Sequence, residues 1–341
     1  MAVSPLRRGW TTGACATAAT AAAYAALRTG AFPDPVTIAL PGGQRPAFVL
    51  AIERLEDDAA TAGVVKDAGD DPDVTHGALV LSTVRFGAPG SGVVFRAGPG
   101  VGTVTLPGLP VPVGEPAINP VPRRLMREAV GDADVIVEVG VEGGEELARR
   151  TWNPRLGIEG GLSILGTTGV VVPYSCSAWI ASIQQGIDVA GAAGHEHVIA
   201  ATGDVSERAA RAVYAVPDSA VLDMGDFAGA TLKYLARHPL PRLTLAGGFA
   251  KLSKLASGHL DLHSGRSQVD LDRLARLAGV PAIAEANTAM HALELARQAG
   301  VPLADRVAAD ARDVALGVLG GTPVAVDVLV VSRAGEIVGR A

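Results

Sequence analysis

Apolar and polar positions follow two different rhythms along the 341-residue chain. Near the start, an alanine-rich stretch with Thr11 and Thr12 as candidate N-caps and Gly30 near its end predicts a helix. Short segments with the two-residue period of strands follow it. We predict helices over 14–27 and 123–130, and strands over 36–40, 47–55, 78–86, 92–97 and 134–141. Several neighbouring strands with few helices between them are typical of an α+β layer structure, here with a largely antiparallel sheet.

The rest of the chain alternates strands with helices of ~10 residues. A helix is predicted over 178–190, before the glycine-rich segment 191–194. Beyond it we predict strands over 197–202, 220–224, 242–246 and 324–331, helices over 207–216, 227–236, 271–277, 288–299 and 306–316, and an edge hairpin over 333–338. This alternation predicts parallel βαβ winding. The sequence thus indicates a mixed α/β protein, with an N-terminal α+β domain over 1–192 and a C-terminal doubly wound, Rossmann-like domain over 193–341.

Composition narrows the class of protein. Hydrophobic residues make up 48% of the chain and charged residues 19%, which allows a sizeable core and excludes a disordered chain. The formal net charge of −6 and the lack of a basic run exclude a nucleic-acid binder. No uninterrupted apolar run reaches the ~18 residues of a membrane helix, and the stretch after Arg7-Arg8 is too weakly hydrophobic for an export signal. Cys15 and Cys176 have no paired spacing, which is typical of a cytoplasmic protein.

Glycine-rich turns follow three strands of the predicted C-terminal sheet. In such sheets, ligands bind at the carboxyl ends of strands, where the winding direction switches. A glycine there lets the backbone approach a ligand, and an acid after the second strand commonly binds both ribose hydroxyls of an adenosine group. The candidate residues are Gly203, Asp204, Ser206, Asp223, Gly225, Gly247 and Gly248. Because no G-x-G-x-x-G follows the first strand, ordinary strand-to-helix turns are an equal alternative.

Lysines and histidines gather after the third of these strands. Lys251 and Lys254, two of the four lysines, are three residues apart and share one face at helical spacing. Shortly after them, His259 and His263 flank Asp261 at alternating positions, which is compatible with acid–base chemistry or with a polar loop. This spacing is not that of a zinc site, so we predict no protein-bound metal.

Two glycine-containing segments lie in the N-terminal half. Asp67 and His76 belong to a segment with three more aspartates around one turn, where the bidentate Glu of a calcium loop is missing and ordinary turn-forming Asp is the alternative. Segment 98–102, Gly-Pro-Gly-Val-Gly, is followed by a β-like stretch and not by a helix. We therefore interpret it as a hairpin, or as a loop at the edge of a cleft, and not as a phosphate loop.

Seven ordered motifs carry a resemblance to a known family. They are Thr11-Thr12-Gly13; Lys66 to Gly77; Gly98 to Gly102; Gly114 to Pro120 with Pro122-Arg123-Arg124; Asn153 to Gly161; Leu165 to Gly169; and Lys251 to Ala256 with Gly258-His259. With these motifs the chain closely resembles the CbiD family of cobalamin biosynthesis over nearly its whole length.

The resemblance implies a methyltransferase that uses S-adenosylmethionine as methyl donor. Its substrate would be a cobalt-containing tetrapyrrole, cobalt-precorrin-5B, methylated at ring carbon C1 to give cobalt-precorrin-6A, and the cobalt would enter with this substrate. Because the tetrapyrrole carries carboxylate arms, cationic side chains and helix N-termini are expected to bind it. The candidates are Thr11, Thr12, Gly13, Lys66, Arg123, Arg124, Arg155, Lys251 and Lys254.

The methyl donor is already activated, so the protein would mainly align the two reactants. A base that accepts a proton from the ring is expected among His259, His263, Asp67 and His76, in this order of preference. A nucleotide-dependent oxidoreductase and a non-catalytic corrinoid carrier are the alternatives. The sequence leaves the oligomeric state open, a homo-oligomer included.

Overall fold

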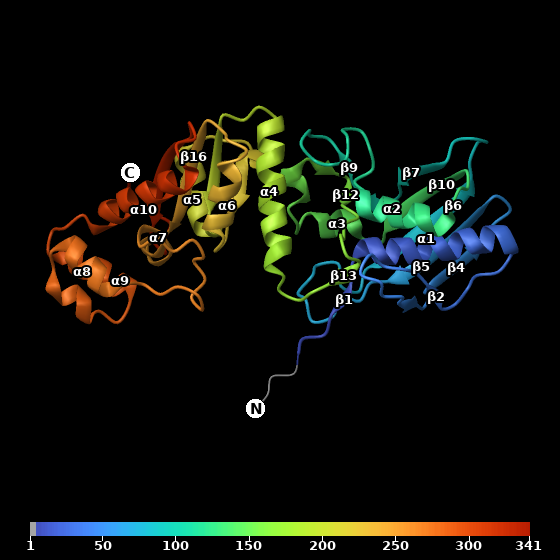
Figure 1. Ribbon diagram of the computed structural model, residues 1–341, viewed down its shortest axis with the longest axis horizontal. Helices are drawn as coiled ribbons and strands as arrows, with labels where there is room; N and C mark the ends of the chain where they lie inside the picture. Colours follow the sequence, from blue (N-terminus) through green and yellow to red (C-terminus); the bar gives the residue numbers. More distant parts are fainter. Residues whose placement is uncertain (1–4) are drawn as a thin grey trace. The chain divides into compact units, whose positions relative to one another are not determined.

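The computed structural model describes residues 5–341 (Figure 1). The chain divides into two compact units: unit 1 ends at Cys176, and unit 2 is Ser177–Ala341. Both units combine helices with strands, which confirms the mixed α/β class. Over the described residues, no helix is both long and apolar enough to cross a membrane.

The boundary between the units differs from the predicted one at residue 192. It falls after the first residue of helix α4 (Cys176–Ala192), because Ile183, Ile187 and Ala190 of this helix belong to the hydrophobic core of unit 2. The glycine-rich segment 191–194 therefore ends a helix inside unit 2 and does not separate two domains.

Unit 1 is built on a five-stranded sheet with the order β4-β5-β6-β10-β7. Its strands are β4 (Ile52–Leu55), β5 (Ala59–Val65), β6 (Leu79–Phe86), β10 (Val135–Val141) and β7 (Val93–Ala97). All neighbours are antiparallel except β10 and β7. Four short pairs complete the strands: β1 (Gly9–Trp10) with β13 (Val170–Val171), β2 (Val36–Thr37) with β3 (Ala47–Phe48), β8 (Gly100–Val101) with β12 (Gly161–Leu162), and β9 (Thr103–Val104) with β11 (Ile158–Glu159).

The helices of unit 1 are α1 (Thr12–Thr29), α2 (Pro120–Val130) and α3 (Gly144–Ala148), with a 3-10 turn η1 (Asn153–Leu156). Helices α1 and α2 cover one face of the sheet (Figure 1), where alternate residues of β6 and β10 are buried. Helix α1 begins as predicted: the Thr11 side chain caps the Ala14 amide, and Gly30 ends the helix at φ 81°. Most of its alanines are buried, and the Thr20 hydroxyl lies 2.8 Å from that of Ser82 on the sheet. The small side chains thus let α1 lie close to the strands.

Unit 2 contains a second five-stranded sheet, with the order β15-β14-β16-β17-β18. Its elements in chain order are β14 (His197–Ala201), α5 (Asp204–Val213), η2 (Asp218–Ala220), β15 (Val221–Asp223), α6 (Ala228–Leu235), β16 (Arg242–Gly248), α7 (Phe249–Ala256), α8 (Leu271–Ala278), η3 (Pro281–Glu285), α9 (Ala289–Gln298), α10 (Leu303–Leu319), β17 (Ala325–Val331) and β18 (Ile337–Arg340). The first four strands in this order are parallel, and β18 forms the predicted antiparallel edge with β17.

Helices cover both faces of this sheet. Ile199 and Ala201 of β14 pack against Ala210 of α5, whereas Val198 and Ala200 belong to the larger core that contains α6, α7 and α10. The next strand along the chain, β15, lies on one side of β14, and β16 lies on the other. The direction of winding therefore reverses at β14.

Several elements differ from the sequence prediction. Strand β5 was not predicted, because Ala and Gly fill four of its seven positions and hide the two-residue alternation. Helix α7 was anticipated only through the spacing of its lysines. Strands β2 and β3 are two residues each, shorter than the predicted segments.

Glycine has opposite roles at two positions, and this gives a stability test. A Cβ at Gly9 would lie 2.1 Å from the backbone carbonyl carbon of Ala68, whereas a Cβ at Gly317, inside α10, would meet nothing within 4 Å. We expect Gly9→Ala to lower the free energy of unfolding by about 1–3 kcal/mol or more. The control Gly317→Ala should raise it by about 0.5–1 kcal/mol, because the helical backbone loses less entropy on folding. Urea unfolding measures the free energy of unfolding of both variants. Equal effects of the two substitutions would contradict the close approach of the backbone at Gly9 to that at Ala68.

Candidate functional site

The predicted donor-binding residues lie along one edge of the unit 2 sheet. Ala201, the last residue of β14, is in register with both Asp223 and Ala246 on the neighbouring strands. The carboxyl ends of β14 and β15 therefore lie at the same level, and β16 continues beside β17 to Gly248. The turns that follow these three strands leave the same edge of the sheet. Since the winding reverses at β14, the structure brings these turns together at the position where such sheets bind ligands.

Glycines shape the backbone at this edge. Gly203, the residue before α5, adopts φ 155° and ψ 170°, a region that is essentially restricted to glycine. The Ser206 hydroxyl donates to the Gly203 carbonyl at 2.8 Å, and Asp204 is exposed in the first turn. A Cβ at Gly247 would lie 3.0 Å from the Thr202 side chain, whereas Gly248 faces open space. The turn after β14 thus presents backbone and the N-terminal amides of α5.

Asp223 is a half-buried carboxylate at the end of β15. Its Oδ1 accepts a hydrogen bond from the Gly225 amide at 3.2 Å. Burial raises the pKa of Asp223 above 3.8, and the nearby charges of Glu207 and Asp204 act in the same direction. A buried acid with a perturbed pKa at a strand end is typical of a binding site.

Trp179 of α4 also lies at this edge, although no sequence motif marks it as a site residue. Its indole Nε1 donates to the Asp223 carbonyl at 3.0 Å, and its six-membered ring lies 3.3 Å from the position of a Cβ at Gly225. The side chain remains 43% exposed, so it offers an aromatic surface beside Asp223. The rarity of Trp in this chain could have indicated this residue, but the predicted domain boundary at 192 places α4 in the N-terminal domain.

The two lysines of α7 make internal contacts at the same edge. Lys251 Nζ donates to the Thr202 carbonyl at 2.9 Å and lies 3.1 Å from Asp226 Oδ1. Lys254 is buried, and its Nζ donates to the Leu262 carbonyl at 2.8 Å. Both were predicted to bind substrate carboxylates. In the structure, Lys251 joins the turns after β14 and β15, and Lys254 holds the loop that carries the histidines.

His259 and His263 are exposed in the loop after α7. His263 Nδ1 accepts from the Gly265 amide at 3.1 Å, which leaves Nε2 as the outward nitrogen. The His259 amide donates to Lys254 O, and its ring contacts no polar partner among residues 5–341. Within those residues, no group of three or more His, Cys, Asp or Glu side chains gathers to hold a metal ion.

In unit 1, the N-terminal ends of α1 and α2 meet at one segment. The Gly13 amide donates to the Leu165 carbonyl at 3.0 Å, and the Asn119 amide donates to Ile164 at 2.9 Å. A Cβ at Gly13 would lie 2.6 Å from the Pro122 ring. The predicted Thr11–Gly13 motif therefore lies beside the start of α2, where the positive ends of two helix dipoles attract anions.

The predicted residues of segment 66–77 are largely engaged with one another. Lys66 is 2% exposed, forms an ion pair with Asp73 and donates to the Thr75 hydroxyl at 2.5 Å. Asp67 forms an ion pair with Arg7, which lowers the pKa of Asp67 to about 2. His76 Nδ1 accepts from the Ala68 amide at 3.1 Å. These contacts tie Lys66 to its own loop and make Asp67 a weak base.

The three predicted arginines differ in their surroundings. Arg123 donates to the carbonyls of Ile118 and Pro116 and lies 5.3 Å from the centre of the Phe95 ring, so it supports the start of α2 from inside. Arg155 lies over Trp152. Arg124 is exposed and lies 3.6 Å from Glu128 one turn along α2.

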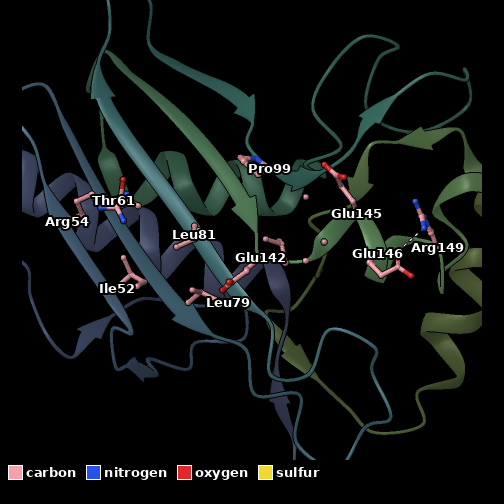
Figure 2. A pocket seen from close by; sticks show the side chains of 14 residues that line it. Ile52, Arg54, Thr61, Leu79, Leu81, Pro99, Glu142, Glu145, Glu146 and Arg149 are labelled. Atoms are coloured by element: carbon pink, nitrogen blue, oxygen red, sulfur yellow. Dashed lines mark hydrogen bonds and ion pairs between the residues drawn. The ribbon is translucent and has the colours of Figure 1, made fainter.

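A pocket of about 650 Å³ lies in unit 1, away from the predicted residues. Figure 2 shows Ile52, Thr61 and Leu81 on strands at one side, and Glu145, Glu146 and Arg149 of the α3 region at the other. Pro99 and Gly100 also line it. The Gly98–Gly102 loop thus edges a cleft, as the sequence analysis expected.

Two family profiles match most of unit 1 and the C-terminal part of unit 2. The family profile CbiD matches residues 2–173, and the profile "CbiD, C-terminal domain" matches residues 261–341. Proteins named cobalt-precorrin-5B C(1)-methyltransferase from Brucella anthropi and Brucella canis are 61% and 60% identical to this chain, over 98% of it and 95% of each relative. A crystal structure of the cobalamin biosynthesis protein cbiD from Archaeoglobus fulgidus matches with 26% identity and a TM-score of 0.40, over 87% of this chain and 85% of that one.

The class of protein is a two-unit mixed α/β chain whose second sheet reverses its direction of winding at β14. This chain belongs to the CbiD family.

Asp223 gives a pH-dependent stability test of the edge. Because its folded-state pKa is raised above 3.8, ionisation of this carboxylate lowers the stability of the folded protein as the pH rises from 3.8 through the raised value. Asp223→Asn keeps an acceptor for the Gly225 amide and removes the charge. We expect the variant to melt at a higher temperature than the wild type at neutral pH, with the difference shrinking as the pH falls from the raised pKa toward 3.8 and vanishing below 3.8, where Asp223 is protonated in both states. A difference that does not change with pH would contradict the buried charge.

Proposed function

We propose that this chain is a methyltransferase that transfers a methyl group to ring carbon C1 of cobalt-precorrin-5B, in the synthesis of the corrin ring. The observation that carries the proposal is the 61% identity, over 98% of the chain, to a relative named for this activity. The product would be cobalt-precorrin-6A, and the cobalt enters as part of the substrate.

We assign the methyl donor, S-adenosylmethionine, to the unit 2 edge and interpret this unit as a Rossmann-like domain. Asp223 is suited to the ribose hydroxyls, since a carboxylate accepts two hydrogen bonds at once. Trp179 offers an aromatic surface for an adenine ring beside it. Gly203 and the start of α5 present backbone amides to an anionic group. The donor supplies an activated methyl group, and the protein supplies alignment, which is worth ~7–11 kcal/mol.

Substrate carboxylates are assigned to unit 1. Thr12 begins α1 beside the start of α2, where the positive ends of two helix dipoles favour anions, and Arg124 is exposed on α2. Gly13, Lys66 and Arg123 are left out of this assignment because internal contacts occupy them. For the proton that leaves the ring, His259 is the preferred acceptor: it is exposed, and it follows α7 directly.

Methyl transfer is tested with S-adenosylmethionine carrying a labelled methyl group and cobalt-precorrin-5B. We expect the label in the tetrapyrrole at C1, with one product ring for each donor consumed. Asp223→Asn should weaken donor binding about tenfold, while the exposed control Asp313→Asn should leave it unchanged. Tight tetrapyrrole binding without label would identify a carrier, and a change in ring oxidation with NAD(P)H would identify an oxidoreductase.

The base is tested separately through His259. We expect His259→Ala to lower kcat about 100-fold and to change tetrapyrrole affinity less than twofold, because the imidazole acts on a proton and not on the carboxylates. The matched control is His291→Ala on α9, whose ring is also exposed. Small and equal changes in kcat and affinity would assign His259 to a polar loop instead.

A further inference from the structure

The pocket of unit 1 lies on the sheet face opposite to α1 and α2 (Figure 2). Its floor follows from the strand register: Ile52 pairs with Gly63, Gly63 with Leu81, and Leu81 with Gly140. Both glycines lack a side chain in this row, and a Cβ at Gly63 would lie 2.9 Å from Ile52 and from Leu81. The two apolar side chains therefore close over Gly63 and form a smooth, half-buried floor.

The opposite wall is backbone. A Cβ at Gly100 would lie 2.0 Å from the Val141 carbonyl oxygen, and a Cβ at Gly144 would lie 2.3 Å from the Gly100 oxygen. Glycine at these places lets the 98–102 loop and the start of α3 pack directly against the end of β10. The result is a fixed trough of about 650 Å³, within the range of small-molecule and cofactor sites.

Charges at the rim are unevenly placed. Arg54 is exposed on β4 and, among the described residues, has no ion pair or side-chain hydrogen bond. Arg149 lies 2.8 Å from Glu146, so this pair is internally compensated. Glu142 follows β10 and lies beside Leu79 (Figure 2), and Glu145 is exposed on α3. The rim thus offers an unpaired cation at β4 and carboxylates at the end of β10 and on α3.

We propose that this pocket binds the macrocycle of the tetrapyrrole, with one ring face on Ile52, Leu79 and Leu81 and carboxylate arms directed to Arg54. This assignment rests on the proposed function. A flat apolar ring with acidic arms matches an apolar floor beside an unpaired guanidinium, which binds carboxylates in a bidentate manner. Glu142 and Glu145 repel the same arms and therefore fix which edge of the ring lies toward β4.

Arg54 is tested with a stable corrinoid probe, cobyrinic acid, whose seven arms are carboxylates, and with its heptamethyl ester, whose arms are uncharged. We expect Arg54→Ala to weaken binding of cobyrinic acid about fivefold or more and to leave the ester unchanged. Glu142→Gln should tighten binding of the acid about twofold, because a repulsive charge is removed. The matched control is Arg96→Ala, an exposed arginine of the same sheet outside the pocket.

The floor is tested with Ile52→Ser on the edge strand β4. We expect this change to weaken the acid and the ester alike, since both lay the same ring on the floor. Equal losses for Arg54→Ala and Arg96→Ala, or an unchanged affinity in Arg54→Ala and Ile52→Ser, would overturn the assignment. Thermal melting of each variant confirms that unit 1 remains folded.

Failure of this assignment is separable from failure of the proposed function. If the wild type methylates cobalt-precorrin-5B and Arg54→Ala keeps its KM, the activity stands and the pocket is not the ring site. If the wild type transfers no methyl group but binds cobyrinic acid through Arg54, the pocket stands and the catalytic proposal fails.

Discussion

Close approach of backbone to backbone is the constraint on which unit 1 depends. The chain crosses itself at Gly9 and Ala68, at Gly100 and Val141, and again where a Cβ at Gly161 would lie 2.3 Å from Gly100. Only glycine leaves room for such crossings. These crossings account for several of the 42 glycines, and many of the others lie in turns with positive φ. The alanines of α1 extend the same principle to a helix that lies directly on a sheet.

The same constraint shapes the surfaces to which we assign a function. On the open face of the unit 1 sheet, Ile52 and Leu81 close over Gly63, and Gly140 adds no side chain to this row. In unit 2, Gly203 leads the chain from β14 into α5, and Gly247 lies directly beside the Thr202 side chain. Glycine therefore has two uses in this chain: it joins segments in one unit and shapes the turns of the proposed donor site in the other.

The sequence was most informative where local chemistry determines the outcome. Thr11 and Gly30 bound α1 because capping depends on a few neighbouring atoms, and the βαβ rhythm of unit 2 follows from periodicity alone. Strand β5 could not be predicted, because its Ala and Gly residues do not show the alternation of apolar and polar positions that marks a strand. The internal contacts of Lys66 and Arg123 could not be predicted either. A charged residue in a motif has the same sequence pattern whether it binds a ligand or a polar group of its own chain. The floor of the pocket could not be predicted, because it comes from strands whose register only the folded sheet defines.

Asp223 indicates a binding site because its charge destabilises the folded protein. Burial and the carboxylates of Glu207 and Asp204 all disfavour its charge, and the Gly225 amide and Lys251 offset them only in part, since the pKa remains raised. Lys251 meanwhile contacts Thr202 and Asp226, so its charge is shared among several acceptors. A chain under selection for stability alone would carry a neutral acceptor at this strand end. A carboxylate held there at a cost, beside an exposed indole and a glycine turn, is consistent with a ligand that supplies the missing donors.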